Sequence, residues 1–453
     1  MDTDGKSLVK TANGAAKKAE KPESRNKKRI FFDAVLGVGF LCCLVPGPLP
    51  GLVPFASALL LLCIAVSFFD ENFYLYAALF IYCRYTMLLG DTPVYRLYSY
   101  LIVLRFLMEI KNTKFKPIYF PALLVFFLHS VFALPTITNL RTGLNVIVDV
   151  VLIYIILLKI LEDKQLVRKF IFVFLLGGVT SGVYGWTRKD VAVDINVAGA
   201  GVYKVNRNFG SLNDSNFAGL FYSLCITCTI VLKKIPVWLK CIFVGLFMIM
   251  LLQTASLSAL LVLGIQLALF IILKYRSKSV IILTSFFVAV AVLILVALAV
   301  PQLRNSGMVS GLVIRITEKL SYIQRGRLDL LTTDRSDIWD NAIRLYFSLP
   351  WWGKLIGGKV VTVMAIDFTI VSMACHNSYL QSLLNFGFFG ALAIYIPLFI
   401  VFFFRLVRHF TTREGYDDED IGILRLIFPF AFMVFGFTVD FFIDWPYMML
   451  YFF

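Results

Sequence analysis

The stretch MACHNSYLQSLLNFGFFGAL, Met373–Leu392, contains the kind of boundary that decides this fold. A polar segment ends at His376, and an apolar run follows that can begin a transmembrane helix, which needs about 20 mainly apolar residues. Such runs recur along the chain of 453 residues, which is 59% hydrophobic and only 16% charged. Because soluble domains carry about a quarter charged residues, the sequence predicts an all-α, polytopic membrane protein with about 12–14 transmembrane helices.

A net charge of +15 is compatible with a nucleic-acid partner, but the distribution of Lys and Arg along the chain favours a membrane topology. Lys and Arg gather in alternate connections such as EIKNTKFKP, KYRSK and FRLVRHFTTREG, whereas PGPLPG, LLGDTP and LLQTAS contain none. Cytoplasmic loops are the ones enriched in Lys and Arg. We therefore expect a multi-pass protein of the cytoplasmic membrane with both termini in the cytoplasm and no nucleic-acid partner.

Four regions follow from this topology. We expect a disordered, basic cytoplasmic tail (1–30), a first set of transmembrane helices (31–300, with an outer loop at 187–215), a large extracytoplasmic loop subdomain (301–375) and C-terminal transmembrane helices (376–453). Structureless loops of this length are uncommon and often functional. The large loop is therefore predicted to be partly helical and to form a lid over a site.

Two helices are predicted inside the large loop. The first has an apolar face at helical spacing, made of Leu312, Val313, Ile316, Leu320 and Ile323. Arg315, Glu318 and Lys319 fall off that face. The second is predicted to run from Ser336 to Tyr346.

Polar residues continue from His376 into the next helix. Asn377, Gln381 and Asn385 are spaced i, i+4 and i+8, so they form one stripe. Polar groups in a membrane helix face the bundle interior or a wet cavity. Gly387, further along, suits close helix packing. On this stretch alone, a histidine that is merely hydrogen-bonded above a packing stripe explains the pattern as well as a functional one.

Two arginines stand at comparable boundaries. Arg335 precedes an amphipathic segment, and Arg207 precedes a Gly-Ser turn with Asp214 or Ser215 as the N-cap of the next span. The guanidinium fork suits phosphate oxygens. Each arginine alone is equally explained as an interface anchor or a helix-flanking surface charge.

Together these stretches resemble the O-antigen ligase/O-antigen polymerase superfamily of membrane glycosyltransferases, over roughly residues 200–405. The resemblance rests on RNFGSLNDSN at Arg207–Asn216, on RSDIW at Arg335–Trp339 and on HNSYL at His376–Leu380, with later Pro and Gly positions. It implies an inverting, metal-independent transfer of a glycan from undecaprenyl diphosphate to a sugar hydroxyl at the outer face. That reaction would serve surface polysaccharide synthesis (O-antigen, capsule or exopolysaccharide).

The resemblance also assigns roles. His376 is the expected general base, since imidazole accepts a proton near neutral pH. Arg335 and Arg207 are expected to stabilise the diphosphate leaving group. Further substrate-binding candidates are Asn377, Gln381, Arg325, Arg327 and Arg344. No cofactor or metal is expected, and the expected partners are the lipid-linked donor, the glycan acceptor, membrane lipid and other polysaccharide assembly proteins.

One departure bears on the reaction. Family members often carry an arginine after Thr-x-Ser/Thr in the outer turn before a span, and here Leu257 stands in its place. The spacing between Gly353 and Gly357 is also stretched. We therefore expect a polymerase, with an O-antigen ligase or a protein O-oligosaccharyltransferase as alternatives.

Two other classes stay open at this point. A flippase or transporter for the same lipid-linked oligosaccharide would also have many spans and buried charges, although many transporters are built from internal repeats, which are not evident here. A non-catalytic membrane partner of an envelope assembly complex would use His376 only structurally.

Several rare residues receive a structural interpretation or no role. His129 is predicted to be structural and to face the bundle, and the CxxC at Cys225 and Cys228 to be packing. His409 is predicted to lie in a basic inner loop, on the wrong side of the membrane for this chemistry. Intramembrane charges often mark function. Here we favour mutual pairing over a lipid-diphosphate groove for three of them, which are Arg84, Arg105 and Asp149. Asp440 and Asp444 receive no role.

Overall fold

The structure is a computed structural model. It describes residues 22–70, 72–83, 86–89, 92–113, 124, 148, 151–152, 154–160, 163–187, 191–197, 201–212, 214–275, 278–285, 288, 300, 310–326, 335–357, 363–364, 372–373, 375–411 and 419–438. Several predictions of the sequence analysis lie outside these residues, namely those for Arg84, His129, Asp149, Arg327, Asp440 and Asp444.

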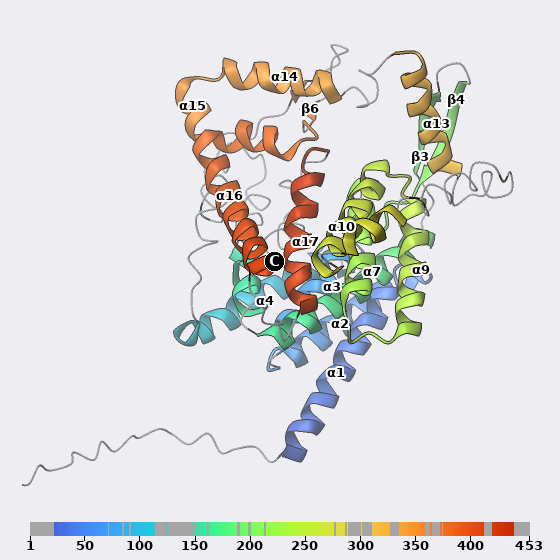
Figure 1. Ribbon diagram of the computed structural model, residues 1–453. Coiled ribbons are helices and arrows are strands. Elements are labelled where there is room, and N and C mark those ends of the chain that lie inside the picture. Colours follow the sequence, from blue (N-terminus) through green and yellow to red (C-terminus); the bar gives the residue numbers. More distant parts are fainter. Residues whose placement is uncertain are drawn as a thin grey trace, which may run out of the picture.

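Apolar helices make up most of the described chain (Figure 1). The bundle contains α1 (Pro22–Leu44), α2 (Val53–Ser67), α3 (Tyr76–Cys83), α4 (Val94–Glu109), α7 (Lys164–Thr187), α8 (Ser215–Val231), α9 (Val237–Gln253), α10 (Leu257–Tyr275), α16 (Ser378–Thr411) and α17 (Glu419–Phe435). Single 3-10 turns flank some of these helices, at Pro50–Leu52, Phe73–Leu75 and Ile110–Asn112.

Four described helices are long and apolar enough to cross a membrane. They are Pro50–Ser67, Gln165–Thr187, Leu257–Tyr275 and Ser378–Thr411. Two shorter apolar helices, α8 and α9, lie between the second and third of these. The prediction of an all-α, polytopic membrane protein is confirmed, and the total number of spans stays a prediction.

Close packing in the bundle depends on small residues and buried rings. The helices α7, α8 and α9 contact one another, and a Cβ on Gly178 of α7 would lie 2.8 Å from the Phe247 ring and 2.9 Å from Cys225 Sγ. Phe221 of α8 is fully buried beside them. Cys225 therefore sits in a packed helix contact, as the packing interpretation of the CxxC requires.

One intramembrane arginine is held by an acidic partner. Arg105 of α4 forms an ion pair with Glu109 at 2.7 Å, and its guanidinium also donates to the backbone carbonyls of Phe68 and Asp70. Lys159 reaches the same Glu109 at 2.9 Å. Arg105 is thus paired with Glu109, whereas Arg84 and Asp149, named beside it in the sequence analysis, lie outside the described residues.

A smaller set of elements lies across one end of the bundle, opposite the start of α1 (Figure 1). We call it the cap region. It consists of the hairpin β3–β4 (Val191–Val197 and Gly201–Arg207), α13 (Ser310–Gln324), α14 (Arg335–Ser348) and α15 (Trp351–Ile356). Two further two-stranded pairs are β1–β2 (Leu88–Leu89 with Thr92–Pro93) and β5–β6 (Val363–Met364 with Ser372–Met373).

The hairpin is a feature that the sequence analysis missed. Its antiparallel register pairs Val191 with Arg207 and Val197 with Gly201. The segments VAVDINV and GVYKVNR are rich in β-branched residues, which is a strand signal. Part of the expected outer loop at 187–215 is therefore an ordered hairpin, and the second strand of this hairpin ends at Arg207.

The predicted helix near residue 316 exists as α13, and its predicted apolar face is buried only in part. Leu312 and Val313 are buried, whereas Leu320 is 49% exposed, Ile323 is 51% exposed and Glu318 is only 6% exposed. Helix α13 packs against the β3–β4 hairpin, and Glu318 lies on its buried side. Helical periodicity located the helix, but it could not show which side the tertiary contacts bury.

The predicted helix at 336–346 is confirmed as α14. Its residues Ile338 and Ala342 are buried against Cys375 and Leu384, which belong to the start of α16 and the loop before it. This contact attaches α14 to the residues around His376.

Helix α16 is broken soon after it begins, which the sequence analysis did not foresee. Gly387 has φ 69° and ψ −178°, a conformation open essentially only to glycine. Ser378–Phe386 therefore forms a short arm beneath α14, and the longer part of α16 descends beside α17 (Figure 1). A Cβ on Gly387 would lie 2.5 Å from the Gly357 nitrogen, so this glycine admits the end of α15.

Candidate active site

Arg207 is fixed where three elements meet. Its Nε donates to the carbonyl of Thr254 at 3.0 Å, in the turn between α9 and α10. Its Nη2 lies 3.4 Å from Oδ1 of Asn216, which also accepts from Ser256 at 2.9 Å. The end of β4, the α9–α10 turn and the start of α8 are thereby joined through one guanidinium.

Asp214 provides the N-cap of α8, which settles the choice that the sequence left between Asp214 and Ser215. Its carboxylate accepts from the backbone nitrogens of Asn216 at 2.7 Å and Phe217 at 3.0 Å. A capping carboxylate is a common way to satisfy the first amides of a helix. It also leaves one negative charge beside Arg207.

Three arginines act on one another electrostatically. Burial, together with the positive charges of Arg315 and Arg335, lowers the pKa of Arg207 to about 10 against the opposing effect of Asp214. Burial, then Arg315, likewise lowers the pKa of Arg335, again opposed by Asp214. Groups that shift one another in this way lie within a short electrostatic range. The cluster therefore has a net positive charge.

Arg315 is the residue that sequence reasoning missed. Burial lowers its pKa, and Glu318 one turn further along α13 opposes that shift. Its Nε is buried and has no hydrogen-bond partner among the residues that the structure describes. The only available signal was an arginine three residues before a glutamate on a predicted polar face, and such pairs are common on solvated helices.

His376 has an unusual backbone conformation. Its φ is 50°, in the left-handed region that non-glycine residues seldom adopt. Burial lowers the pKa of the imidazole, Arg335 lowers it further, and Asp214 opposes this. The histidine therefore shares its electrostatic surroundings with the arginine cluster and stays neutral at neutral pH.

The loop that carries His376 is held by hydrogen bonds on both sides. The amide of Cys375 donates to Gln381 Oε1 at 3.0 Å, and the indole of Trp339 donates to the Cys375 carbonyl at 3.1 Å. Gln381 in turn donates to Asn385 at 2.9 Å. The left-handed conformation at His376 is thus enclosed by fixed neighbours, as a strained residue requires.

The far side of the loop is tied to the helix start and to α17. Asn377 is buried, and its Oδ1 accepts from the amides of Tyr379 at 3.0 Å and Leu380 at 3.1 Å, which caps α16. The amide of Ser378 donates to the carbonyl of Gly436 at 2.7 Å. Much of the polar stripe predicted after His376 thus finds partners within the protein.

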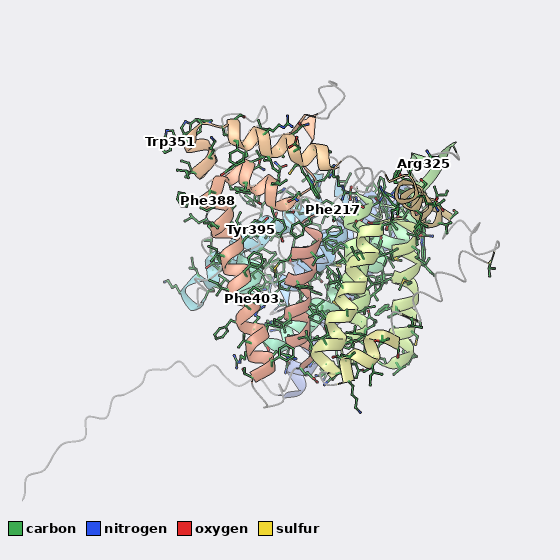
Figure 2. All side chains as sticks on the ribbon, turned by 45° about the horizontal axis from the view of Figure 1, so that its top comes forward. Phe217, Arg325, Trp351, Phe388, Tyr395 and Phe403 are labelled. Atoms are coloured by element: carbon green, nitrogen blue, oxygen red, sulfur yellow. The ribbon has the colours of Figure 1, made fainter. Side chains whose placement is uncertain are left out.

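The other predicted arginines lie at the surface. Arg344 forms an ion pair with Asp340 on α14 at 2.7 Å, and its side chain is 77% exposed. Arg325 is exposed just beyond α13, at the edge of the cap region in Figure 2. His409, predicted to lie in an inner loop, is instead buried in the last turn of α16, with Nε2 3.0 Å from the carbonyl of Leu273.

The positive charge of the cluster is increased by helix ends. Helix α8 begins beside Asp214, α14 begins at Arg335, and α16 begins two residues after His376. Helix N-termini carry partial positive charge and favour anions. Within the described ranges no group of three His, Cys, Asp or Glu side chains is placed to hold a metal ion.

These features define a class: a polytopic membrane protein with a cationic, histidine-containing site at one end of its helical bundle. Residues 241–395 match the family model described as O-antigen ligase, a segment that contains Arg315, Arg335 and His376. This match supports the resemblance to the O-antigen ligase/O-antigen polymerase superfamily that was stated from the sequence. No curated protein showed significant similarity to the chain. The family match supports an O-antigen ligase or polymerase type of function in surface polysaccharide synthesis.

Proposed function

We propose that this protein is a metal-independent, inverting glycosyltransferase that polymerises oligosaccharides linked to undecaprenyl diphosphate at the outer face of the cytoplasmic membrane. One observation carries the proposal. A neutral, half-buried histidine shares a site with three half-buried arginines, and these four residues come from four separate parts of the fold, namely β4, α13, α14 and the loop before α16. That combination suits proton removal next to an anionic leaving group.

His376 is the base in this proposal. Its imidazole takes the proton of the acceptor hydroxyl while the hydroxyl oxygen attacks the anomeric carbon. The bond from that carbon to the diphosphate oxygen breaks, and its electron pair leaves with the diphosphate. Attack from the face opposite the leaving group inverts the configuration. The lowered pKa of His376 keeps the base in its proton-accepting form at neutral pH.

The arginines stabilise the charge that develops on the leaving diphosphate. Preorganised cations are often the largest single contribution to such a reaction. Arg335 and Arg207 were assigned this role from the sequence, and we add Arg315. The buried Nε of Arg315, without a partner in the described part of the chain, supports the addition because a phosphate oxygen would satisfy it.

Asn377 and Gln381 receive a positioning role in this scheme. Their hydrogen bonds hold the loop on either side of His376. Arg325 and Arg344, which are exposed, are proposed only as peripheral contacts to the glycan, and Arg327 stays a prediction.

Polymerase activity remains the preferred reaction, and an O-antigen ligase or a protein O-oligosaccharyltransferase is the alternative. Leu257 begins α10 directly after the turn that binds Arg207. The position that carries an arginine in many relatives therefore lies near the site but brings no charge. In ligases that arginine is expected to serve catalysis, so its absence at Leu257 favours the polymerase reaction.

The test uses purified protein in liposomes with lipid-linked repeat units and measures chain length. Polymerase activity predicts longer chains on the lipid, whereas a flippase would move the units across the bilayer without extending them. His376→Ala should abolish extension at an unchanged protein level. Persistent product with His376→Ala would exclude the proposed base.

A further inference from the structure

A second surface of the cap region is strongly apolar and exposed. On α14, Ile343 is 42% exposed and Phe347 is 67% exposed. On α15, Trp351 is 74%, Trp352 is 47% and Ile356 is 66% exposed. We call these five residues the α14–α15 patch. Exposed apolar surfaces of this kind mark contacts with another apolar phase or partner.

The patch is not the face by which α14 packs on the protein. Ile338 and Ala342 occupy that face, against the arm of α16. The exposed ion pair between Asp340 and Arg344 marks the polar edge of the helix. Helix α14 therefore has one side on protein, one side with charges and one apolar side that no described residue covers.

The patch continues into the apolar surface of a membrane-spanning helix. After the break at Gly387, Phe388 is 44% exposed and Phe389 is 56% exposed, and Phe403 further down α16 is 56% exposed. Figure 2 shows Trp351, Phe388 and Phe403 one below the other along the same side of the molecule. Since α16 is long and apolar enough to span a membrane, its exposed apolar side chains face lipid.

We propose that the α14–α15 patch lies in the bilayer itself, at the boundary between headgroups and acyl chains of the leaflet nearest His376. Three observations identify lipid as the occupant. The patch is continuous with the lipid-facing side of α16, it contains two adjacent tryptophans, and α14 lies crosswise to the descending part of α16 (Figure 1). Tryptophan concentrates at membrane interfaces, and amphipathic helices lie in the interface plane with the apolar face buried about 5–10 Å.

The membrane contact has a structural consequence for the site. Gly357 at the end of α15 and Gly387 in α16 approach so closely that a Cβ on Gly357 would lie 2.6 Å from the Phe386 carbonyl carbon. The glycine contact fixes α15, which directly follows α14, so α14 is held at its C-terminal end through α15 and along its length by lipid. Its other end begins with Arg335. The bilayer thus sets the height at which Arg335 meets the loop of His376.

The experiment measures tryptophan emission from the full-length protein in nanodiscs. One preparation contains phosphatidylcholine brominated near the headgroup, a second contains lipid brominated near the chain ends, and a third contains unbrominated lipid. The difference in tryptophan emission between the unmodified protein and the double variant Trp351→Phe/Trp352→Phe gives the signal of the patch. Trp339→Phe is the matched control, because Trp339 lies in the same cap region, on α14, and its indole donates to the Cys375 carbonyl instead of facing the patch.

We expect the patch signal to be quenched by brominated lipid, and more strongly by bromines near the headgroup than by those near the chain ends. The Trp339 signal should be quenched much less. Quenching of the patch by aqueous iodide but not by lipid would overturn the proposal, because the patch would then face water. Protection from both quenchers would also overturn it, because another protein surface or a second copy would then cover the patch. Neither readout depends on glycosyl transfer, so failure here is separate from failure of the proposed function.

Discussion

Replacing Gly357 by alanine tests whether the contact between α15 and α16 holds the cap region together. Gly357 has φ 70° and ψ −136°, which an alanine adopts only at a cost of about 1–3 kcal/mol. The new Cβ would also lie 2.7 Å from the Phe386 Cα and 2.6 Å from its carbonyl carbon. These are backbone atoms, so the clash cannot be relieved by rotating a side chain, and overpacking of this kind adds about 1–3 kcal/mol.

A matched control separates the two contributions. Gly326, at the end of α13, has φ 67°, and a Cβ there would have no neighbour within 4 Å. Gly326→Ala therefore carries a cost for its positive φ but no clash. We expect Gly357→Ala to be less stable than Gly326→Ala by about 1–3 kcal/mol, measured as the difference in thermal unfolding midpoints of the purified proteins. Glycosyl transfer should fall with Gly357→Ala as well, because α14 carries Arg335.

The reasoning fails if the two alanine variants unfold at the same temperature. That result would mean that α15 and the break in α16 do not approach each other in the folded protein. If Gly357→Ala is clearly destabilised but keeps its glycosyl transfer activity, the glycine contact stabilises the fold without positioning Arg335.

Three further predictions concern the charges of the site. The rate of glycosyl transfer should fall as pH decreases through the lowered pKa of His376, since protonation removes the base. Arg335→Ala removes a positive charge that lowers this pKa, so the pKa should rise and the acidic limb of the kcat/KM profile should move to higher pH. Arg335→Lys should retain more turnover than Arg335→Ala, because charge is kept while the fork is lost, and equal, full activity in both would remove Arg335 from the site. Arg315→Ala should lower kcat by about 10–1000-fold. Arg344→Ala is the control, because Arg344 belongs to an exposed ion pair, and it should change kcat little. Equal effects of the two variants on kcat in steady-state assays would contradict the role given to Arg315.

Much of the helical framework could be predicted because apolar length is written directly in the sequence. The span expected to follow an N-cap at Asp214 or Ser215 appears as α8, and the uncharged connection LLQTAS falls at the junction of α9 and α10. Helix α14 was predicted because its apolar residues contact an apolar partner, so periodicity and burial agree. Helix α13 shows the limit: Leu312 and Val313 are buried as expected, but Glu318 is buried too, while Leu320 and Ile323 are exposed.

The candidate site was predicted in part for a related reason. His376, Arg335 and Arg207 stand in short motifs at helix and strand boundaries, which a linear pattern can reveal. Arg315 stands inside a helix without a motif, and only the packing of α13 on the β3–β4 hairpin brings it beside Arg207. The break at Gly387 was missed because a glycine in an apolar run is usually tolerated in membrane helices. Its conformation is imposed by α15, which is distant in the sequence.

The hydrogen bond from Ser378 to Gly436 has a practical consequence for genetics. The end of α17 supports the residue two positions after His376, and the hydroxyl of Tyr379 reaches the carbonyl of Met433 in the same helix at 2.6 Å. A random screen for inactive alleles will therefore collect changes around Gly436 that never touch a sugar or a phosphate. Suppressors of such alleles should map to the opposite partner, near Tyr379, and tags fused close to this helix should be chosen with the same connection in view.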